Sequence, residues 1–163
     1  MNVETHMTTS TDSPNVIVRP PLLYLGGVIL LLALRWLWPA PILGDAAPGR
    51  WAGGVLAVAA LGLGLWAVAT MRAAGTNVDP GKASTAMVTA GPFGFTRNPI
   101  YVGLAVLFLG VTLIVDSWWG LAVLVPLLAV MHTGVIRREE AYLDRKFGDA
   151  YRRYTASVGR YVG

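Results

Sequence analysis

The sequence contains no cysteine and very little charge. Of its 163 residues, 13% are charged and 55% are hydrophobic, whereas about a quarter of the residues in a typical soluble domain are charged. The absence of cysteine excludes disulfides, thiolate zinc sites and a cysteine nucleophile, and we expect no metal site. The shortage of charge indicates a membrane protein, and the length is that of one domain.

Four apolar segments have a length suited to crossing a bilayer, which takes roughly 20 apolar residues in a helix. They are residues 20–39, 51–71, Pro99–Val115 and 118–136. Only two residues separate the last pair, so these two segments must form a tight antiparallel hairpin. The pattern predicts an all-α, polytopic transmembrane protein with four spans and a cytoplasmic C-terminal helix.

The spans divide the chain into three regions. Residues 1–19 are polar and lack the basic and apolar regions of a signal peptide, so we expect a flexible tail. Residues 20–71 hold two transmembrane helices. Residues 72–163 combine a long polar loop, the helical hairpin and a charged C-terminal helix, and we expect the functional site there. A long loop without structure of its own is often functional.

Basic residues are concentrated on one side of the predicted membrane. With four spans, the tail, the middle loop and the C-terminus share that side, and it holds Arg19, Arg72, Lys82, Arg97, Arg137, Arg138, Arg145, Lys146, Arg152, Arg153 and Arg160. Lysine and arginine mark the cytoplasmic side, so we expect both termini in the cytoplasm and a bacterial or archaeal inner membrane. The net charge of +4 then indicates contacts with membrane lipids and no nucleic-acid partner.

The third span begins with a polar segment. Asn98 and Pro99 form a good N-cap and first-position pair, and Tyr101 follows one turn inside. One interpretation is an ordinary capped membrane helix with an interfacial tyrosine. The other is a ligand site, because the N-terminus of a helix offers free N–H groups to an anion.

An acidic pair follows the last span. Residues at intervals of three or four form one helical face: Ile136, Glu140, Leu143, Phe147, Tyr151, Tyr154 and Val158. Glu140 therefore turns inward, and because a buried unpaired carboxylate is costly, we expect it to meet a cation. Alternatively, Glu139 and Glu140 simply pair with adjacent arginines on a solvated helix. His132 lies seven residues before Glu139, on roughly the same face. It is either a packing residue or a functional one.

Three segments together resemble a known family. They are GPFGFTRNPIYVG at 91–103, RREEAYL at 137–143 and FGDAYRRY at 147–154, with a hydrophobic hairpin between the first two. Their order and spacing are similar to those of isoprenylcysteine carboxyl methyltransferases and of related phospholipid N-methyltransferases. The resemblance covers about residues 75–158, and the first two spans match only in character.

The resemblance implies a membrane-embedded methyltransferase that uses S-adenosylmethionine in a cytoplasm-facing pocket capped by the C-terminal segment. Carried over by motif, the cofactor-binding residues are Thr85, Ala86, Met87, Val88, Gly91, Phe93, Arg97, Asn98, Pro99, Tyr101, Glu139 and Glu140. Asn98 stands where the eukaryotic pattern has histidine, which removes a titrating imidazole from that position.

The candidate catalytic residues are Tyr101, His132 and Arg137. The acceptor would be a lipophilic small molecule, a lipid or a lipidated substrate that enters from the bilayer. A carboxylate acceptor needs no base, whereas an amine must arrive deprotonated, and His132 or a glutamate would then assist. The alternatives are an NADPH-dependent reductase of the sterol or steroid type and a non-catalytic membrane scaffold. The oligomeric state stays open.

Overall fold

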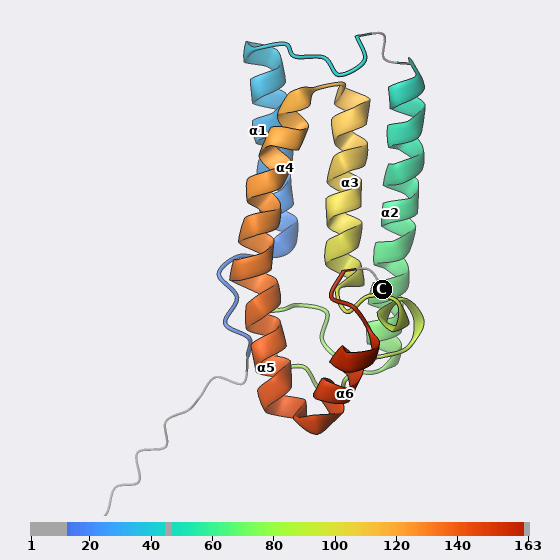
Figure 1. Cartoon of the computed structure of the whole chain (residues 1–163), viewed down its shortest axis with the longest axis vertical. Coiled ribbons are helices and arrows are strands. Elements are labelled where there is room, and N and C mark those ends of the chain that lie inside the picture. Colours follow the sequence, from blue (N-terminus) through green and yellow to red (C-terminus); the bar gives the residue numbers. More distant parts are fainter. Residues whose placement is uncertain (1–12, 45–46, 162–163) are drawn as a thin grey trace, which may run out of the picture.

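The computed structural model describes residues 13–44 and 47–161, and all regular structure in this part of the chain is helical. Four helices lie side by side along the long axis: α1 (Pro20–Leu37), α2 (Ala47–Ala73), α3 (Pro99–Val115) and α4 (Trp118–Met131) (Figure 1). Three helical stretches are long and apolar enough to cross a membrane, and the 17-residue α3 is a shorter apolar helix between them. The predicted all-α, polytopic transmembrane fold is therefore confirmed.

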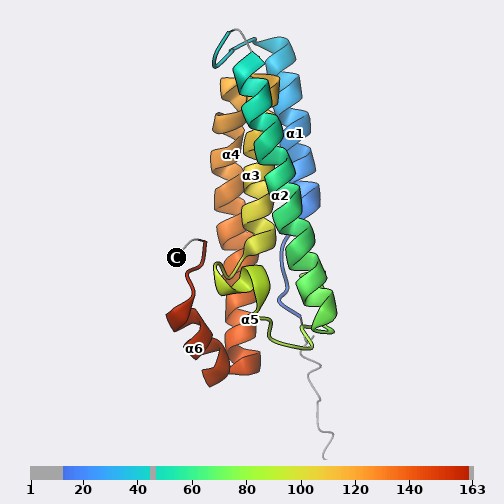
Figure 2. The ribbon, with the colours of Figure 1, turned by 90° about the vertical axis from the view of Figure 1, so that its right-hand side faces the viewer.

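The fourth helix continues past the apolar region. A π-helical turn, η2 (His132–Ile136), joins α4 to α5 (Arg137–Phe147), and α6 (Asp149–Ser157) then turns away from the axis of α5 (Figures 1 and 2). The single C-terminal helix predicted from the sequence is wrong, because Gly148 breaks it with φ +51° and ψ −126°, a conformation that glycine adopts readily. The predicted inward face survives the break, since Tyr151, Tyr154 and Val158 are buried.

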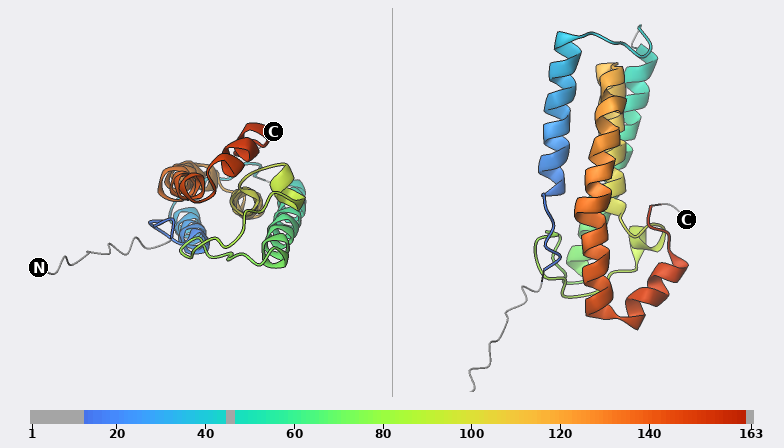
Figure 3. Two further views of the ribbon diagram at one scale, coloured as in Figure 1. Left: turned by 90° about the horizontal axis from the view of Figure 1, so that it is seen from below. Right: turned by 60° about the vertical axis from the view of Figure 1, so that its left-hand side comes forward.

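Helices α2 and α3 approach each other through small residues. A Cβ atom added at Gly110 would lie 2.8 Å from the backbone oxygen of Gly53, and one added at Gly103 would lie 3.2 Å from that of Ala60. Small residues at such positions allow membrane helices to pack by close van der Waals contact. Viewed along the bundle (Figure 3), α3 lies between α2 and the pair formed by α1 and α4.

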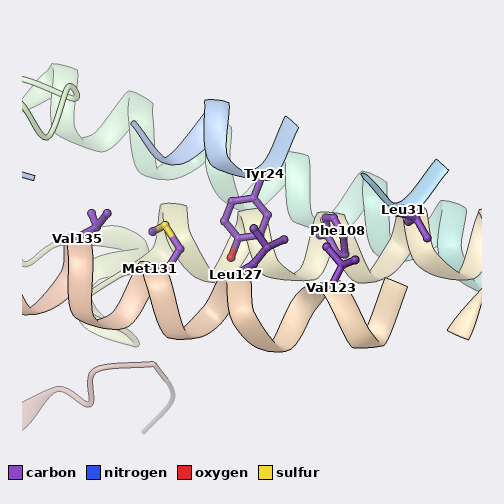
Figure 4. Close-up of a cluster of buried hydrophobic side chains, with 7 residues drawn as sticks. All are labelled: Tyr24, Leu31, Phe108, Val123, Leu127, Met131 and Val135. Atoms are coloured by element: carbon purple, nitrogen blue, oxygen red, sulfur yellow. The ribbon is translucent and has the colours of Figure 1, made fainter. Parts of the chain in front are cut away.

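A second set of contacts joins α1, α3 and α4 in an apolar core (Figure 4). Its buried members are Tyr24, Leu31, Phe108, Val123, Leu127, Met131 and Val135. The rings of Tyr24 and Phe108 lie 6.1 Å apart and tilted by 60°, a favourable arrangement for aromatic pairs. The outer faces of α1, α2 and α4 carry many exposed leucine, valine and tryptophan side chains, as expected of surfaces that contact lipid.

The end of the bundle at the top of Figure 1 is closed by Asp116. This residue lies between α3 and α4 in a left-handed conformation (φ 51°). Its carboxylate accepts hydrogen bonds from the backbone N–H groups of Ile42 and Leu43 at 2.9 Å and of Gly44 at 3.3 Å. These bonds lower the pKa of Asp116 below its ordinary value. The carboxylate thereby ties the loop after α1 to the α3–α4 hairpin.

The segment before α1 packs against the opposite end. Of the predicted flexible tail, residues 1–12 lie outside the described part of the chain. Ile17 donates its N–H to the Gly134 oxygen in η2 (3.3 Å), and the Asn15 oxygen accepts a bond from Arg138 (2.9 Å). The side chain of Ile17 lies directly over Gly134, where a Cβ atom would come within 2.5 Å of it. Residues 13–19 are thus part of the folded structure.

Candidate functional site

A cavity lies at the end of the bundle opposite Asp116, where the middle loop, the start of α3, α5 and α6 meet. The cavity has a volume of about 120 Å³, whereas one water molecule needs roughly 10–15 Å³, so the cavity can hold an organic ligand. The polar and aromatic residues in its wall include Asn77, Asp79, Lys82, Phe93, Arg97, Asn98, Tyr101, Glu139, Glu140, Tyr142, Tyr151 and Tyr154.

Tyr101 and Glu139 join α3 to α5 across this cavity. The Tyr101 hydroxyl donates a hydrogen bond of 2.8 Å to Oε1 of Glu139. Tyr101 reaches this position because it follows Pro99 by two residues, in the first turn of α3. This bond holds the Glu139 side chain in place in the cavity wall.

Glu140 forms a second link, with two arginines. Arg97 Nη1 lies 3.2 Å from Oε1, and Arg160 donates from Nε and Nη2 at 2.8 to 3.1 Å to the two carboxylate oxygens. The side chains of Glu140 and Arg97 are only 15% and 13% exposed. The prediction that Glu140 turns inward and meets a cation is therefore confirmed, and the cations come from the start of α3 and from the C-terminus.

Asn98 lies at the N-cap position of α3, and Pro99 is the first helical residue, as predicted. The Asn98 side chain makes no capping hydrogen bond. It donates instead through Nδ2 to the backbone oxygen of Arg160 (3.0 Å), which also accepts a bond from the Thr96 hydroxyl (3.1 Å). The expectation of side-chain capping is thus wrong, and the asparagine amide is held by its Nδ2 bond to the C-terminal segment.

Aromatic side chains form the wall next to α6. Burial raises the pKa of Tyr151 and of Tyr154 to about 12, so both phenols stay neutral at physiological pH. The Tyr154 hydroxyl donates to the backbone oxygen of Phe93 (2.7 Å), which belongs to the short 3-10 helix η1 (Gly91–Gly94). This bond fixes the turn that carries Phe93 against α6.

The middle loop is folded through its own polar groups. The Thr76 hydroxyl accepts the N–H of Thr85 (3.1 Å), and the Thr85 hydroxyl donates to the Gly75 oxygen (2.7 Å). Ala86, Met87 and Val88, which follow Thr85, contribute to the cavity wall, whereas Thr85 itself does not.

Gly91 also lies outside the cavity wall. It has a φ of +59°, and a Cβ atom there would lie 3.0 Å from the Thr70 hydroxyl oxygen of α2. Gly91 is therefore required by the turn and by its packing on α2.

The structure does not bring His132 or Arg137 into the cavity wall. His132 Nδ1 lies 2.6 Å from the Tyr161 hydroxyl, and Arg137 is exposed. The expected common face of His132 and Glu139 assumed an uninterrupted α-helix. The π-helical turn His132–Ile136 changes the helical register, so a spacing of seven residues no longer places two side chains on one α-helical face.

Several residues at the cavity were not predicted from the sequence. Asp79 and Tyr142 line the cavity, and Arg160 holds Glu140 from outside its wall. The inward helical face did predict burial at Tyr151 and Tyr154. The sequence predicts that a buried carboxylate at Glu140 needs a cation. It does not predict that Arg160, among the many arginines, supplies that cation.

Comparisons with known proteins show which family the chain belongs to. The model of the phospholipid methyltransferase family matches residues 49–150. A nickel-cobalt-cadmium resistance protein, NccN, of Alcaligenes xylosoxydans xylosoxydans is 38% identical over 77 residues, which are 46% of this chain and 36% of NccN. An uncharacterized protein of Haemophilus influenzae is 36% identical over 66 residues, which are 39% of this chain and all of that protein.

The chain thus spans only about a third of the length of NccN. No solved structure matches the chain significantly. The family match covers well over half of the 163 residues, including α3, α4, α5 and the acidic pair. The protein belongs to the phospholipid methyltransferase family.

Proposed function

We propose that this protein transfers a methyl group from S-adenosylmethionine to a lipophilic or amphiphilic acceptor in the membrane. One observation carries the proposal. The Glu139 carboxyl group, whose neighbour Glu140 is paired with two arginines, lies in the wall of a cavity that is also lined by Phe93, Tyr151 and Tyr154. Carboxylates and aromatic faces together are suited to a cationic organic ligand.

The groups in the cavity fit the chemistry of this cofactor. Its ammonium and sulfonium cations match a carboxylate at Glu139 and the aromatic faces, and its adenine matches the ring of Phe93. Its carboxylate matches the N-terminus of α3, where the helix dipole is positive. When bound, the cofactor supplies an electrophilic methyl group.

The protein's own residues would act by positioning and by excluding water. Tyr101 holds Glu139 through a 2.8 Å hydrogen bond, so the cation-binding group is oriented before the ligand arrives. A carboxylate acceptor would need no base. For an amine acceptor, Glu139 would be a proton acceptor in the cavity wall, since His132 lies elsewhere.

The site's place in the membrane supports a lipid-derived acceptor. The cavity lies at the end of the bundle where Arg72, Lys82 and Arg137 are found, and Arg50 is at the other end. By the positive-inside rule, the cavity and the C-terminus face the cytoplasm. An acceptor would then enter from the bilayer with its reactive group at the level of the first turn of α3.

Calorimetry on the purified full chain in detergent tests the proposal. S-adenosylmethionine and S-adenosylhomocysteine should both bind, with affinities in the micromolar range, and NADPH should not. Glu139→Gln should weaken the binding of both about a hundredfold. Asp149→Asn, on an α6 carboxylate that is 82% exposed and outside the cavity, is the matched control and should bind normally.

Failure of both methyl-cycle ligands to bind the well-folded chain would refute the proposal. Binding of NADPH in their place would favour a reductase. Binding that survives Glu139→Gln undiminished would move the site away from this cavity.

A further inference from the structure

The two adjacent carboxylates of the cavity are satisfied in different ways. Glu140 is bound by both Arg97 and Arg160, and both of its oxygens are engaged. In the described part of the chain, the Tyr101 hydroxyl on Oε1 is the one side-chain hydrogen-bond partner of Glu139. A carboxylate has about four lone-pair sites, so Glu140 is nearly saturated whereas Glu139 retains free acceptor capacity.

Arg160 is held in place by its own backbone as well as by Glu140. It belongs to residues 158–161, which we call the C-terminal strap. The Gly159 oxygen accepts the N–H of Arg97 (3.0 Å), and the Arg160 oxygen accepts bonds from Asn98 and Thr96. The Tyr161 hydroxyl meets His132, and Val158 is buried at 9% exposure.

We propose that Arg160 is a positioning residue that commits Glu140 to a structural role, so that Glu139 alone meets the cationic group of the ligand. The part of this statement that concerns the ligand rests on the proposed function. A carboxylate that is bound by two nitrogens of an arginine is held more strongly and with a more defined geometry than one bound by a single ammonium group. Exchange of Arg160 for a ligand cation would also break the hydrogen bonds that its guanidinium makes to both oxygens of Glu140.

The strap also explains the side chain at position 98. Asn98 is 8% exposed and donates its amide to the strap instead of capping α3. A histidine in the family's pattern could donate one ring N–H to the same oxygen. The asparagine thus performs a docking role that needs a hydrogen-bond donor and no titratable group.

Cysteine labelling tests the docking of the strap without any ligand. The chain has no cysteine, so a single introduced thiol reacts alone with a maleimide. Val158→Cys, in the strap, should react at least about tenfold more slowly than Ala156→Cys, which is exposed on α6, because reaction requires local opening. Adding Arg160→Gln or Glu140→Gln should raise the rate at position 158 about tenfold, and Asn98→Ala should raise it less.

Two further variants serve as a rescue and as a control for the labelling experiment. Asn98→His should keep the thiol at position 158 protected, because it retains a donor. Arg153→Gln, which changes an exposed arginine of α6, should leave the labelling rate unchanged. Equal labelling of positions 158 and 156 in the parent background, or no response to Arg160→Gln, would overturn the docking of the strap.

Titration with S-adenosylhomocysteine tests the division of roles. Glu139→Gln should lower its affinity about a hundredfold while the thiol at position 158 stays protected. Arg160→Gln should lower the affinity only about tenfold and expose that thiol to the maleimide, and Arg160→Lys should restore part of both. Equal losses of affinity in Glu139→Gln and Glu140→Gln with the strap still docked would overturn the inference. If the parent binds no S-adenosylhomocysteine, the proposed function and the ligand role of Glu139 fail, and the labelling alone decides the docking of the strap.

Discussion

Carboxylates lie at both ends of this helical bundle, and the groups that donate hydrogen bonds to them differ between the two ends. Asp116 receives three backbone N–H groups from consecutive residues of one loop. Glu139 and Glu140 receive side chains that come from the start of α3 and from the C-terminus. The first arrangement closes a loop, and the second forms the wall of a cavity.

The difference shows how a structural carboxylate can be distinguished from one at a binding site. Three backbone donors, fixed by the fold, occupy most of the acceptor sites of Asp116. Side-chain donors can be arranged around a cavity, and they leave Glu139 with unused acceptor capacity. Substitutions at the two ends should therefore separate ligand affinity from stability.

The largest expected effect is on ligand affinity. Glu139→Gln should weaken binding of S-adenosylhomocysteine about a hundredfold, because a charge-assisted contact in a largely buried site is lost. Asp116→Asn, at the opposite end, should leave that affinity unchanged. Calorimetry measures the affinity of both variants. Similar losses of affinity in the two would show that the ends do not differ in their role in ligand binding.

A smaller effect is expected for Tyr101→Phe. This change removes the 2.8 Å hydrogen bond to Glu139 and keeps the ring that packs in the first turn of α3. Affinity for S-adenosylhomocysteine should fall roughly tenfold, since the carboxylate remains but is less well oriented. An affinity equal to that of the parent would show that Tyr101 plays no part in holding Glu139 for a ligand.

At the other end the expected change is in stability. Asp116→Asn should lower the melting temperature of the detergent-solubilised protein by a few degrees, and Asp116→Ala should lower it further. Asparagine keeps an oxygen that accepts from Ile42 or Leu43, whereas alanine leaves all three N–H groups without this partner. Thermal unfolding followed by circular dichroism checks the order, and an alanine variant as stable as the parent would contradict it.

The smallest effect is the pH dependence of that stability difference. The folded state lowers the pKa of Asp116, chiefly through hydrogen bonds from backbone N–H groups. Stabilisation by the ionised group is therefore present above the pKa of an unfolded aspartate, about 4, and is lost as the pH falls through the folded value. The gap in melting temperature between the parent and Asp116→Asn should be widest at neutral pH and should shrink below about pH 4. A gap that widens in acid would refute this account.

The sequence predicted much of the fold because membrane spans depend on local composition. The third span was predicted at the same residues as α3, Pro99–Val115, and the first differs from α1 only at its C-terminal end. The second span was predicted too short, since α2 runs from Ala47 to Ala73. Residues 47–50, which are Ala, Pro, Gly and Arg, continue the helix before Trp51 and beyond the predicted apolar stretch, where hydropathy gives no signal.

The site was predictable in part for a similar reason. Helical periodicity placed Glu140, Tyr151 and Tyr154 on an inward face, and each lines the cavity. Periodicity failed for His132, because the π-helical turn changed the register between it and the acidic pair. It also gave no sign that Gly148 would break the C-terminal helix, since a glycine there is compatible with either outcome.

The sequence by itself determined that the chain spans a membrane, where the apolar helical segments lie and which family it resembles. These properties follow from apolar length, charge and the order of short motifs, all of which are local. Only the tertiary structure decided which cations meet which carboxylates. Arg160 reaches Glu140 because the chain turns back at Gly148 and the Arg160 backbone then accepts hydrogen bonds from Asn98 and Thr96. Such a contact depends on the path of the whole chain, and no local pattern encodes that path.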